Sequence, residues 1–309
     1  MILAGIDAGG TSTKCLLLAE DGTQLSRTET GPANYQVVGL AAALREVKKA
    51  VELARKKAGG RVIDLLGIGM AGAGSVQDID KIKGRLFSMK LARECYLTND
   101  GEIAVTGAHA GKPGIVAIAG TGSIVYGLTD DFSAIRAGGW GPLLGDEGSG
   151  FWIGMQALKA IIKSQENRSN RTALLEKVID ALEITELRGL VDFIYQEKLP
   201  RQEVAALAPL VIEEMEQGDP VAREIITGGM NELASTVKVI AEKIHGVKTA
   251  VAATGGIFAS KTVFDLFSTI LKRDYQLEVK KPIFNPLYGA VLYGAKKSGY
   301  KEFSRLFTL

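Results

Sequence analysis

Cysteine and histidine are scarce in this chain, and their scarcity argues against several classes of protein. Only two cysteines and two histidines occur among 309 residues. Cys15 and Cys95 each fall inside a predicted strand without a neighbouring cysteine, so we expect two buried core thiols and neither a disulfide framework nor a zinc site. His109 and His245 are predicted to be surface residues, and the sequence suggests no catalytic histidine.

Long apolar runs and an excess of one charge are also missing. No stretch approaches the roughly 20 apolar residues of a membrane span, and the first residues do not resemble a signal peptide, so we expect a cytoplasmic protein without a membrane partner. The formal net charge is +2, with basic and acidic residues interleaved. This balance argues against a nucleic-acid partner and favours a small neutral or anionic ligand.

Two common nucleotide-binding motifs are absent, and a pair of glycine turns stands in their place. There is no Gly-x-x-x-x-Gly-Lys-Ser/Thr loop and no Gly-x-Gly-x-x-Gly opening a helix. The turns are Gly9-Gly10-Thr11-Ser12 and Gly120-Thr121-Gly122-Ser123, each between two apolar runs typical of a strand hairpin. Glycine lets backbone N–H groups approach an anion, the hydroxyls add donors, and Lys14 adds a cation. Either turn alone could be a plain hairpin, but two at matching points favour a polyphosphate site.

The order of predicted elements indicates an α/β fold with two similar halves. The first half has strands at 2–7, 15–20 and 24–30, then a helix whose apolar stripe runs through Leu40, Leu44, Val47, Val51 and Ala54, and a strand at 62–70. The second half repeats strands near 114–118, 123–128 and 133–137, with a later apolar run at 250–253. We expect one domain at 1–112 with about 290–309, and a second at 113–289. A helical insertion at about 151–244 is expected to supply substrate walls or the contact of a homodimer.

Two aspartates follow strands at positions suited to phosphoryl transfer. Asp7 lies at the mouth of the first turn, where a carboxylate can hold Mg²⁺ beside phosphates. Asp100 lies at the carboxyl end of a strand and before a predicted helix at 102–108, where ligands of open α/β sheets gather. It is the candidate general base that accepts the proton of an attacking hydroxyl. The alternatives are a turn-capping role for Asp7 and a helix-capping role for Asp100.

The segment 138–152 has the composition of a ligand-binding loop. It holds six glycines, the acidic pair Asp146 and Glu147, and both tryptophans of the chain, Trp140 and Trp152. An aromatic face and carboxylates suit a polyhydroxylated ring. Alternatively, the acidic pair caps a helix that starts near Ser149, and we expect Trp152 to pack that helix.

Three of these segments resemble the N-acetylglucosamine kinase family, also called the BadF/BadG/BcrA/BcrD-type ATPases. They are Gly5 to Thr11, Ala119 to Ser123, and the run from Gly138-Gly139-Trp140-Gly141 to Gly145-Asp146-Glu147-Gly148-Ser149. The family belongs to the superfamily of actin, sugar kinases and large heat-shock chaperones. The resemblance implies two ribonuclease-H-like, actin-like ATPase domains with an ATP cleft between them.

The resemblance also implies roles for single residues. The two glycine turns correspond to the family's two phosphate motifs, Gly255-Gly256 to its adenosine motif, and Asp100 to its catalytic aspartate. The positions that contact the amino sugar correspond to Asn34, Gly139, Trp140 and Asp146, with Gly72 lining the same pocket. Ile124 stands where the animal N-acetylglucosamine kinases carry an asparagine that reaches the sugar, so the need for an acetyl group stays open.

The expected activity is ATP-dependent phosphorylation of an amino sugar, at the 6-hydroxyl of N-acetylglucosamine or glucosamine. Other members of the family are ATP-driven activators of partner enzymes, and these bind an iron–sulfur cluster through cysteines. Cys15 and Cys95 do not resemble those ligands. The alternatives are therefore a nucleotide switch without the cluster and a degenerate sugar-sensing module.

Overall fold

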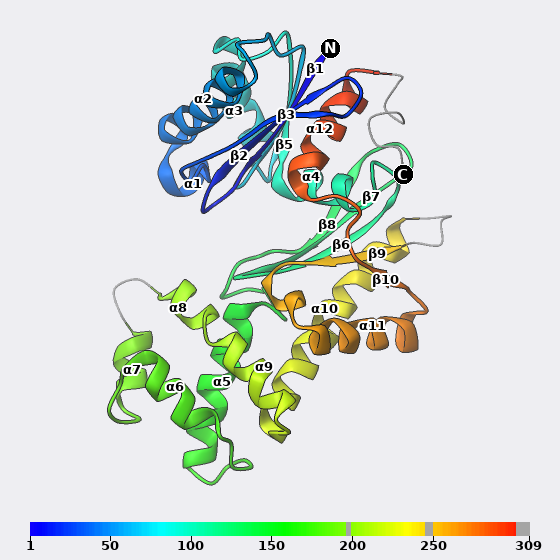
Figure 1. Ribbon diagram of the computed structural model, residues 1–309. Coiled ribbons are helices and arrows are strands. Elements are labelled where there is room, and N and C mark those ends of the chain that lie inside the picture. Colours follow the sequence, from blue (N-terminus) through cyan, green and yellow to red (C-terminus); the bar gives the residue numbers. More distant parts are fainter. Residues whose placement is uncertain (196–198, 245–249, 301–309) are drawn as a thin grey trace. The chain divides into compact units, whose positions relative to one another are not determined.

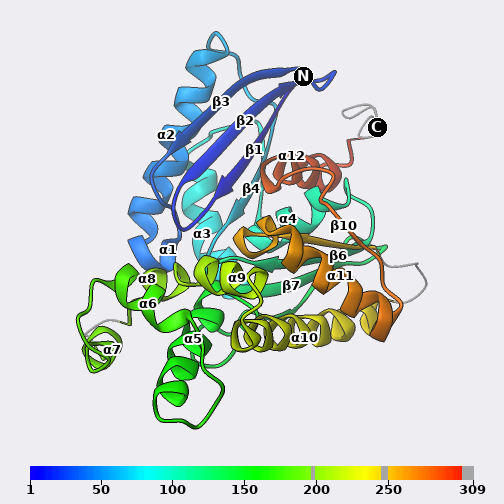
Figure 2. The ribbon, with the colours of Figure 1, turned by 60° about the horizontal axis from the view of Figure 1, so that its bottom comes forward.

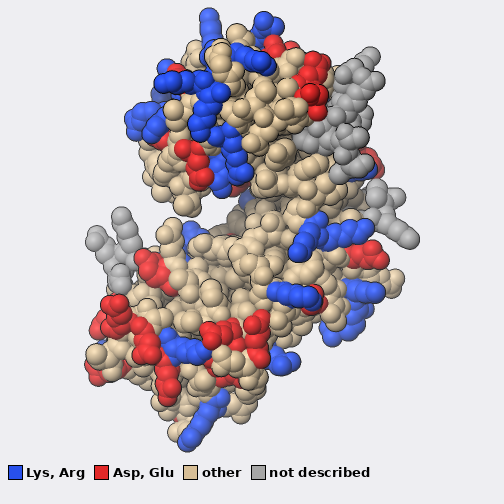
Figure 3. Space-filling model, viewed as in Figure 1, with Lys and Arg blue, Asp and Glu red and all other residues tan. Residues whose placement is uncertain are grey.

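The computed structural model describes residues 1–195, 199–244 and 250–300, which form two compact units (Figure 1). Unit 1 comprises Met1–Gly114, Asp130–Ala134 and the described part of Pro282–Leu309, and unit 2 comprises Ile115–Thr129 and the described part of Ile135–Lys281. No helix among the described residues is long and apolar enough to cross a membrane. Basic and acidic side chains both occur on the face of each unit that Figure 3 shows.

Unit 1 is built on a five-stranded mixed sheet with the order β3-β2-β1-β4-β5. Its strands are β1 (Ile2–Ala8), β2 (Thr13–Ala19), β3 (Gln24–Thr30), β4 (Leu65–Met70) and β5 (Glu94–Asn99). The first three form antiparallel hairpins, whereas β4 and β5 run parallel to β1. The carboxyl ends of β1, β4 and β5 therefore meet at one edge, where ligands of such sheets bind.

Alternating residues of β1 pack against different helices of unit 1. Its helices are α1 (Tyr35–Val38), α2 (Leu40–Lys57), α3 (Val76–Ser88), α4 (Asp100–Ala108) and α12 (Pro286–Lys297). Ala4 and Ile6 lie in one core cluster with Val47 of α2, and Leu3 lies in another with Val291 of α12. Figure 1 shows α2 and α3 on one side of the sheet and α4 and α12 on the other. The apolar face predicted for α2 is confirmed.

Helices α4 and α12 contact each other through their backbones. A Cβ atom on Gly289 would lie 1.9 Å from the carbonyl oxygen of Ile103, and one on Gly107 would lie 2.6 Å from that of Asn285. Neither position can accept a side chain without a backbone shift. This close contact fixes the helix that begins at Asp100.

The second sheet repeats the plan of the first. Its order is β10-β9-β6-β7-β8, with β6 (Gly114–Ala119), β7 (Ser123–Leu128), β8 (Ala134–Gly138), β9 (Val251–Thr254) and β10 (Val279–Lys280). Strand β9 runs parallel to β6 and to β10, as β4 does to β1 and β5. The predicted α/β fold of two related, ribonuclease-H-like halves is confirmed.

Among the described residues between β8 and β9 there are six helices, where the sequence predicts a helical insertion. They are α5 (Gly150–Gln165), α6 (Leu174–Leu182), α7 (Gly189–Ile194), α8 (Arg201–Ala205), α9 (Ala208–Glu216) and α10 (Pro220–Lys243), and η1 (Gly256–Ala259) and α11 (Lys261–Tyr275) follow β9. Figure 2 shows the long helix α10 alongside α5 and α11, which it contacts. Asp219 caps α10 by accepting from the N–H groups of Val221 and Ala222. The buried faces of these helices share one core with β6, β7 and β9.

Several local predictions need correction. The strand predicted at 62–70 begins only at Leu65. Just before it, the Asp64 carboxylate accepts a hydrogen bond from the N–H of Ile2 and pairs with Arg93. Cys15 is buried as predicted, but Cys95 is only partly buried. Burial raises the pKa of both thiols to about 12.

The predicted surface position of His109 is wrong. The residue is 7% exposed and ends α4. Its ring lies where a side chain on Gly114 would otherwise be, since a Cβ there would come within 2.5 Å of the ring. His245, the other histidine, lies outside the described residues.

Candidate functional site

The first glycine turn joins β1 to β2 and exposes its tip. The N–H of Gly9 donates to the carbonyl of Ser12 at 2.9 Å, and the carbonyl of Gly9 accepts from the N–H of Ala33 at 2.9 Å. Gly10 and Thr11 are exposed. These bonds hold the base of the turn and leave its tip accessible, which suits an anion.

Asp7 lies beside Lys14 and within electrostatic reach of Asp100. Asp7 is the register partner of Lys14 in the β1–β2 hairpin, and Asp100 follows β5 at the same sheet edge. The pKa of Asp7 is raised to about 6, first by burial and then by the negative charge of Asp100, while Lys14 lowers it. Unit 1 thus brings together three of the predicted site residues.

Asp100 is the first residue of α4 and does not cap it. The cap is Asn99, whose side chain accepts from the N–H of Glu102 at 2.8 Å. The helix-capping alternative for Asp100 is therefore wrong. One Asp100 oxygen accepts from the N–H of Gly101 at 3.0 Å, and burial raises the pKa of the carboxyl. No ion pair holds this carboxylate within the described ranges.

Asn34 and Gly72, which lie far apart in the sequence, are neighbours in unit 1. A Cβ atom on Gly72 would lie 2.7 Å from the side-chain oxygen of Asn34. Asn34 caps α1 by accepting from the N–H of Gln36 at 3.1 Å. The side-chain amide of Gln36 donates to the carbonyl of Gly72 at 2.9 Å, so Gln36 joins this group. Sequence reasoning missed Gln36, and its position two residues after Asn34 was the only available signal.

The second glycine turn is bound to the start of α5. The N–H of Gly120 donates to the carbonyl of Gly122 at 2.9 Å, and the N–H of Gly150 donates to the carbonyl of Gly120 at 2.8 Å. The Ser123 hydroxyl donates to the carbonyl of Glu147 at 2.7 Å. The Ser123 hydroxyl proton is therefore already engaged in a hydrogen bond within the protein. The hydroxyl of exposed Thr121 and the backbone N–H groups remain as the donors that this turn can offer a ligand.

A cavity of about 770 Å³ opens beside this turn within unit 2. Its walls come from the turn, from helices α8 and α9, and from η1 with the start of α11; they include Thr121, Ala205, Pro209, Ile212, Gly256 and Lys261. Gly255 has a φ of 108°, and a Cβ there would lie 2.2 Å from the carbonyl oxygen of Ala119. Only glycine allows this approach of β9 to β6. The helical insertion therefore provides a wall of this cavity.

Asp146 is buried at the junction of three segments of unit 2. It is 4% exposed, and burial raises its pKa against the opposing effects of Arg201 and of the N–H groups of Gly141 and Ser123. Its carboxylate lies 3.5 Å from the guanidinium of Arg201 at the start of α8. A Cβ on Gly122 would lie 2.7 Å from the same carboxylate. Asp146 thus links the glycine turn, the glycine-rich loop and α8, and sequence reasoning gave no signal for Arg201.

Ser149 caps α5 by accepting from the N–H of Trp152, so the capping alternative for Asp146 and Glu147 is wrong. The prediction that Trp152 packs this helix is confirmed, because it is partly buried against the core of unit 2. Trp140 differs from it, since it is 66% exposed.

The exposed part of the loop places an aromatic ring beside a cation. The guanidinium of Arg136 lies 5.0 Å from the centre of the Trp140 ring. Leu143 and Leu144 are 82% and 81% exposed. The side chain of Ile124 lies against Gly139, where a Cβ would come within 2.4 Å of it. Ile124 therefore borders the loop that is predicted to contact a sugar.

The structure does not contain a ready-made metal cage in its described part. No group of three or more His, Cys, Asp or Glu side chains there could hold a metal ion. The predicted residues form one set in unit 1, around Asp7 and Asp100, and one set in unit 2, around the second turn.

Comparison with known proteins places the chain among relatives that share almost its whole length. An N-acetylmuramic acid/N-acetylglucosamine kinase of Clostridium acetobutylicum is 30% identical over 298 residues, covering 93% of this chain and 96% of the relative. An N-acetyl-D-glucosamine kinase of Dictyostelium discoideum is 28% identical over 94% of this chain and 97% of its own length. A solved structure from Chromobacterium violaceum superposes with a TM-score of 0.78 at 27% identity, covering 94% of this chain and 98% of that one. The sequence profile of the BadF/BadG/BcrA/BcrD ATPase family matches residues 4–294, and the chain belongs to this family.

Proposed function

We propose that this protein is an ATP-dependent kinase that phosphorylates a hydroxyl, the 6-hydroxyl, of an amino sugar such as N-acetylglucosamine or glucosamine. The observation that carries the proposal is Asp100, a solvent-accessible carboxylate of raised pKa that neither caps its helix nor forms an ion pair within the described ranges. The kinase names of the Clostridium and Dictyostelium relatives support the same reaction.

ATP is proposed to bind through the cavity of unit 2 and the two glycine turns. The mixture of small, apolar and polar walls beside Gly256 suits adenosine. The second turn lies at the edge of this cavity, so Thr121 and its neighbouring backbone N–H groups would meet the phosphates. The exposed tip of the first turn supplies further N–H donors, and Lys14 supplies a positive charge.

A magnesium ion fits the donor set of unit 1. Mg²⁺ is commonly held by one or two carboxylates together with phosphate oxygens and water, so the lack of a dedicated cage among the described residues is compatible with it. Asp7 would hold the ion, which when bound neutralises phosphate charge. The pKa of Asp7 is raised despite the positive charge of Lys14, so its ionised form is costly, and a further cation beside it would favour that form.

Asp100 is proposed to act as the general base. The sugar oxygen forms a bond to the γ-phosphorus while the bond from that phosphorus to the oxygen retained by ADP breaks. The proton of the sugar hydroxyl passes to Asp100. Because desolvation raises the pKa of this carboxyl, it is a stronger proton acceptor than an aspartate of ordinary pKa. Most of the remaining acceleration comes from position and charge, as in other phosphoryl transfers.

The sugar is proposed to contact Asn34 beside Gly72 in unit 1 and the loop of Gly139, Trp140 and Asp146 in unit 2. Exposed Trp140 offers an aromatic face for a sugar ring. Asp146 is buried with its carboxylate facing the second turn and α8. Its proposed contribution is therefore largely to hold the loop in place.

The test is the variant Asp100→Asn in a coupled assay of ADP release with a panel of amino sugars. We expect sugar phosphorylation to fall by about 10²- to 10⁴-fold, because the base is lost, while ATP binding stays near normal. Asp80→Asn, which changes an exposed aspartate of α3, serves as the matched control.

Two outcomes would contradict the proposal. Near-normal turnover of Asp100→Asn would show that Asp100 is not the general base. ADP release that does not depend on any sugar would favour the nucleotide switch. Including N-acetylmuramic acid, glucosamine and N-acetylglucosamine in the panel identifies the acceptor. Ile124→Asn then tests whether this position sets the preference for the acetyl group.

A further inference from the structure

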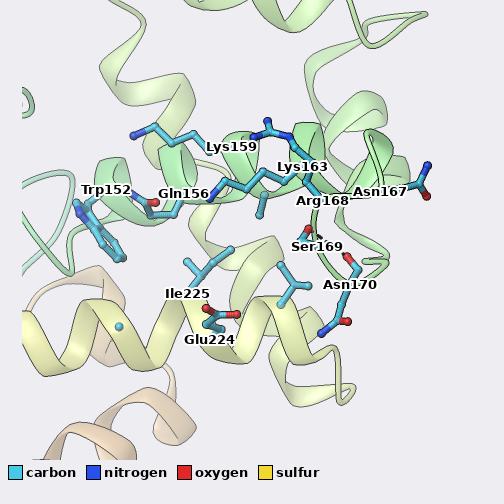
Figure 4. A pocket seen from close by; sticks show the side chains of 13 residues that line it. Trp152, Gln156, Lys159, Lys163, Asn167, Arg168, Ser169, Asn170, Glu224 and Ile225 are labelled. Atoms are coloured by element: carbon cyan, nitrogen blue, oxygen red, sulfur yellow. Dashed lines mark hydrogen bonds between the residues drawn. The ribbon is translucent and has the colours of Figure 1, made fainter.

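A second cavity of unit 2 lies between α5 and α10 (Figure 4). Its volume is about 670 Å³. It shares no lining residue with the cavity beside the second glycine turn. Helix α5 contributes Trp152, Gln156 and Lys163, the turn after α5 contributes Asn170, and α10 contributes Ile225. A space of this size accommodates a monosaccharide with one substituent.

The lining carries an excess of positive charge. Three basic side chains, Lys159, Lys163 and Arg168, and one acidic side chain, Glu224, line the cavity. Arg168 is paired with Glu166, but within the described ranges neither lysine has an ion-pair partner. Lys159 and Lys163 are four residues apart on α5, so they repel each other on one helix face. A bound anion would remove this repulsion.

The remaining walls suit a sugar. Figure 4 shows Trp152 and Gln156 on α5 and Ile225 on α10, with the Lys163 side chain extending along α5 toward Gln156. The indole of Trp152 and the side chain of Ile225 provide an apolar surface for the face of a ring. The amides of Gln156 and Asn170 can donate to and accept from hydroxyl groups.

We propose that this cavity is a regulatory site for a phosphorylated monosaccharide. The phosphate binds Lys163 and Lys159, and the sugar ring lies against Trp152 and Ile225. The choice of a sugar phosphate as ligand rests on the proposed function, because such a compound is the product of that reaction. The site thus gives the enzyme a second place to bind its product.

Helix α5 connects this cavity to the second glycine turn. At its start, Gly150 donates to the carbonyl of Gly120. Trp152 lies two residues further along, and its ring would come within 3.0 Å of a Cβ on Gly229 of α10. A Cβ on Gly148 would lie 2.6 Å from the carbonyl oxygen of Gly229. A ligand against Trp152 therefore acts on the contacts that hold the turn and the glycine-rich loop, and it slows the kinase.

The two tryptophans allow a direct test. In Trp140→Phe, Trp152 is the only tryptophan left, so its emission reports on the cavity. The catalytic site is first saturated with N-acetylglucosamine and a non-hydrolysable ATP analogue, and N-acetylglucosamine 6-phosphate is then titrated. We expect a saturable change in emission, with a dissociation constant that Lys163→Gln raises about ten-fold or more, because one charge-assisted contact is lost.

Matched controls decide between the outcomes. Lys243→Gln removes a lysine from the last turn of another helix and should leave the titration unchanged. In the kinase assay, with Trp140 retained, Lys163→Gln should weaken inhibition by the sugar phosphate by a similar factor without changing KM for ATP. No saturable change in emission, or an equal response in Lys163→Gln, would overturn the proposal.

The probes also separate the parts of the inference. Inorganic phosphate and unphosphorylated N-acetylglucosamine should fail to compete, and competition by either at the same concentration as the sugar phosphate would overturn the assignment of the ligand. Absence of sugar-dependent ADP release would refute the proposed kinase activity. The Trp152 titration would still decide by itself whether the cavity binds a sugar phosphate.

Discussion

Replacing Asp7 by Asn should make the ligand-free protein more stable at neutral pH and destroy its kinase activity. Asp7 is a partly buried residue of β1 whose carboxyl pKa is raised from 3.8 to about 6, first by burial and then by Asp100. The folded chain therefore holds this proton more tightly than the unfolded chain does. Ionising Asp7 at neutral pH costs folding free energy, and the neutral amide of asparagine avoids that cost.

The size and sign of the effect follow from the two pKa values. At about 1.4 kcal/mol per pKa unit, a rise from 3.8 to about 6 corresponds to roughly 3 kcal/mol. The stability associated with the protonated carboxyl is fully present below about pH 4 and is lost as the pH rises through about 6. Relative to the wild type, Asp7→Asn should gain about 3 kcal/mol in free energy of unfolding between pH 4 and pH 7.5.

Urea unfolding without nucleotide or metal provides the measurement. Both tryptophans lie in unit 2, so their emission follows that unit, whereas exchange of the β1 and β4 amide hydrogens follows unit 1. Only the exchange in unit 1 should differ between the variant and the wild type. A stability difference between Asp7→Asn and the wild type that is the same at pH 4 and pH 7.5 would contradict the prediction. So would a variant that is less stable than the wild type at pH 7.5. Loss of activity together with a gain in stability would show that Asp7 serves activity at a cost in stability.

Three further predictions concern other parts of the chain. Both cysteine thiols should react slowly with iodoacetamide at pH 8 and quickly in urea, because burial raises their pKa to about 12; rapid labelling of the native protein would contradict this. Gly255→Ala should lower the unfolding free energy by about 1–3 kcal/mol and weaken ATP binding, since the added methyl group would meet the carbonyl of Ala119 at a positive φ. Calorimetry measures the change in stability, and nucleotide titration measures ATP binding. An unchanged melting temperature would contradict the prediction. Arg201→Gln should lower the stability of unit 2 by about 1 kcal/mol, with partial rescue by Arg201→Lys, because buried Asp146 loses its counter-ion; equal stability of all three proteins would show that the pair contributes nothing.

The sequence was sufficient for features that depend on local signals. The hairpin around Gly9 and its counterpart around Gly120 were visible because apolar strands flank each glycine turn. Their repetition predicted the common plan of the two sheets. The periodic apolar stripe of α2 likewise needed no information from elsewhere in the chain.

Features that depend on distant partners could not be predicted. Asn99 and Asp100 are both good capping residues, and only the backbone of the folded chain shows that Asn99 caps α4. Arg201 meets Asp146 only after the helical insertion has folded against the second sheet. Ala205 of α8 lines the cavity beside the second turn, and no pattern in the sequence singles it out. A pattern of apolar residues reveals that a face is covered, but it does not reveal what covers it.

The close backbone contact between α4 and α12 has a consequence for the order in which the chain becomes active. Helix α12 follows the whole of unit 2 in the sequence, yet it packs against α4, the helix that begins at Asp100. During synthesis, unit 2 can therefore emerge and fold before unit 1 has received its last helix. A nascent chain that already displays the cavity beside the second turn still lacks the support of its proposed base. Catalytic competence is thus delayed until α12 has left the ribosome.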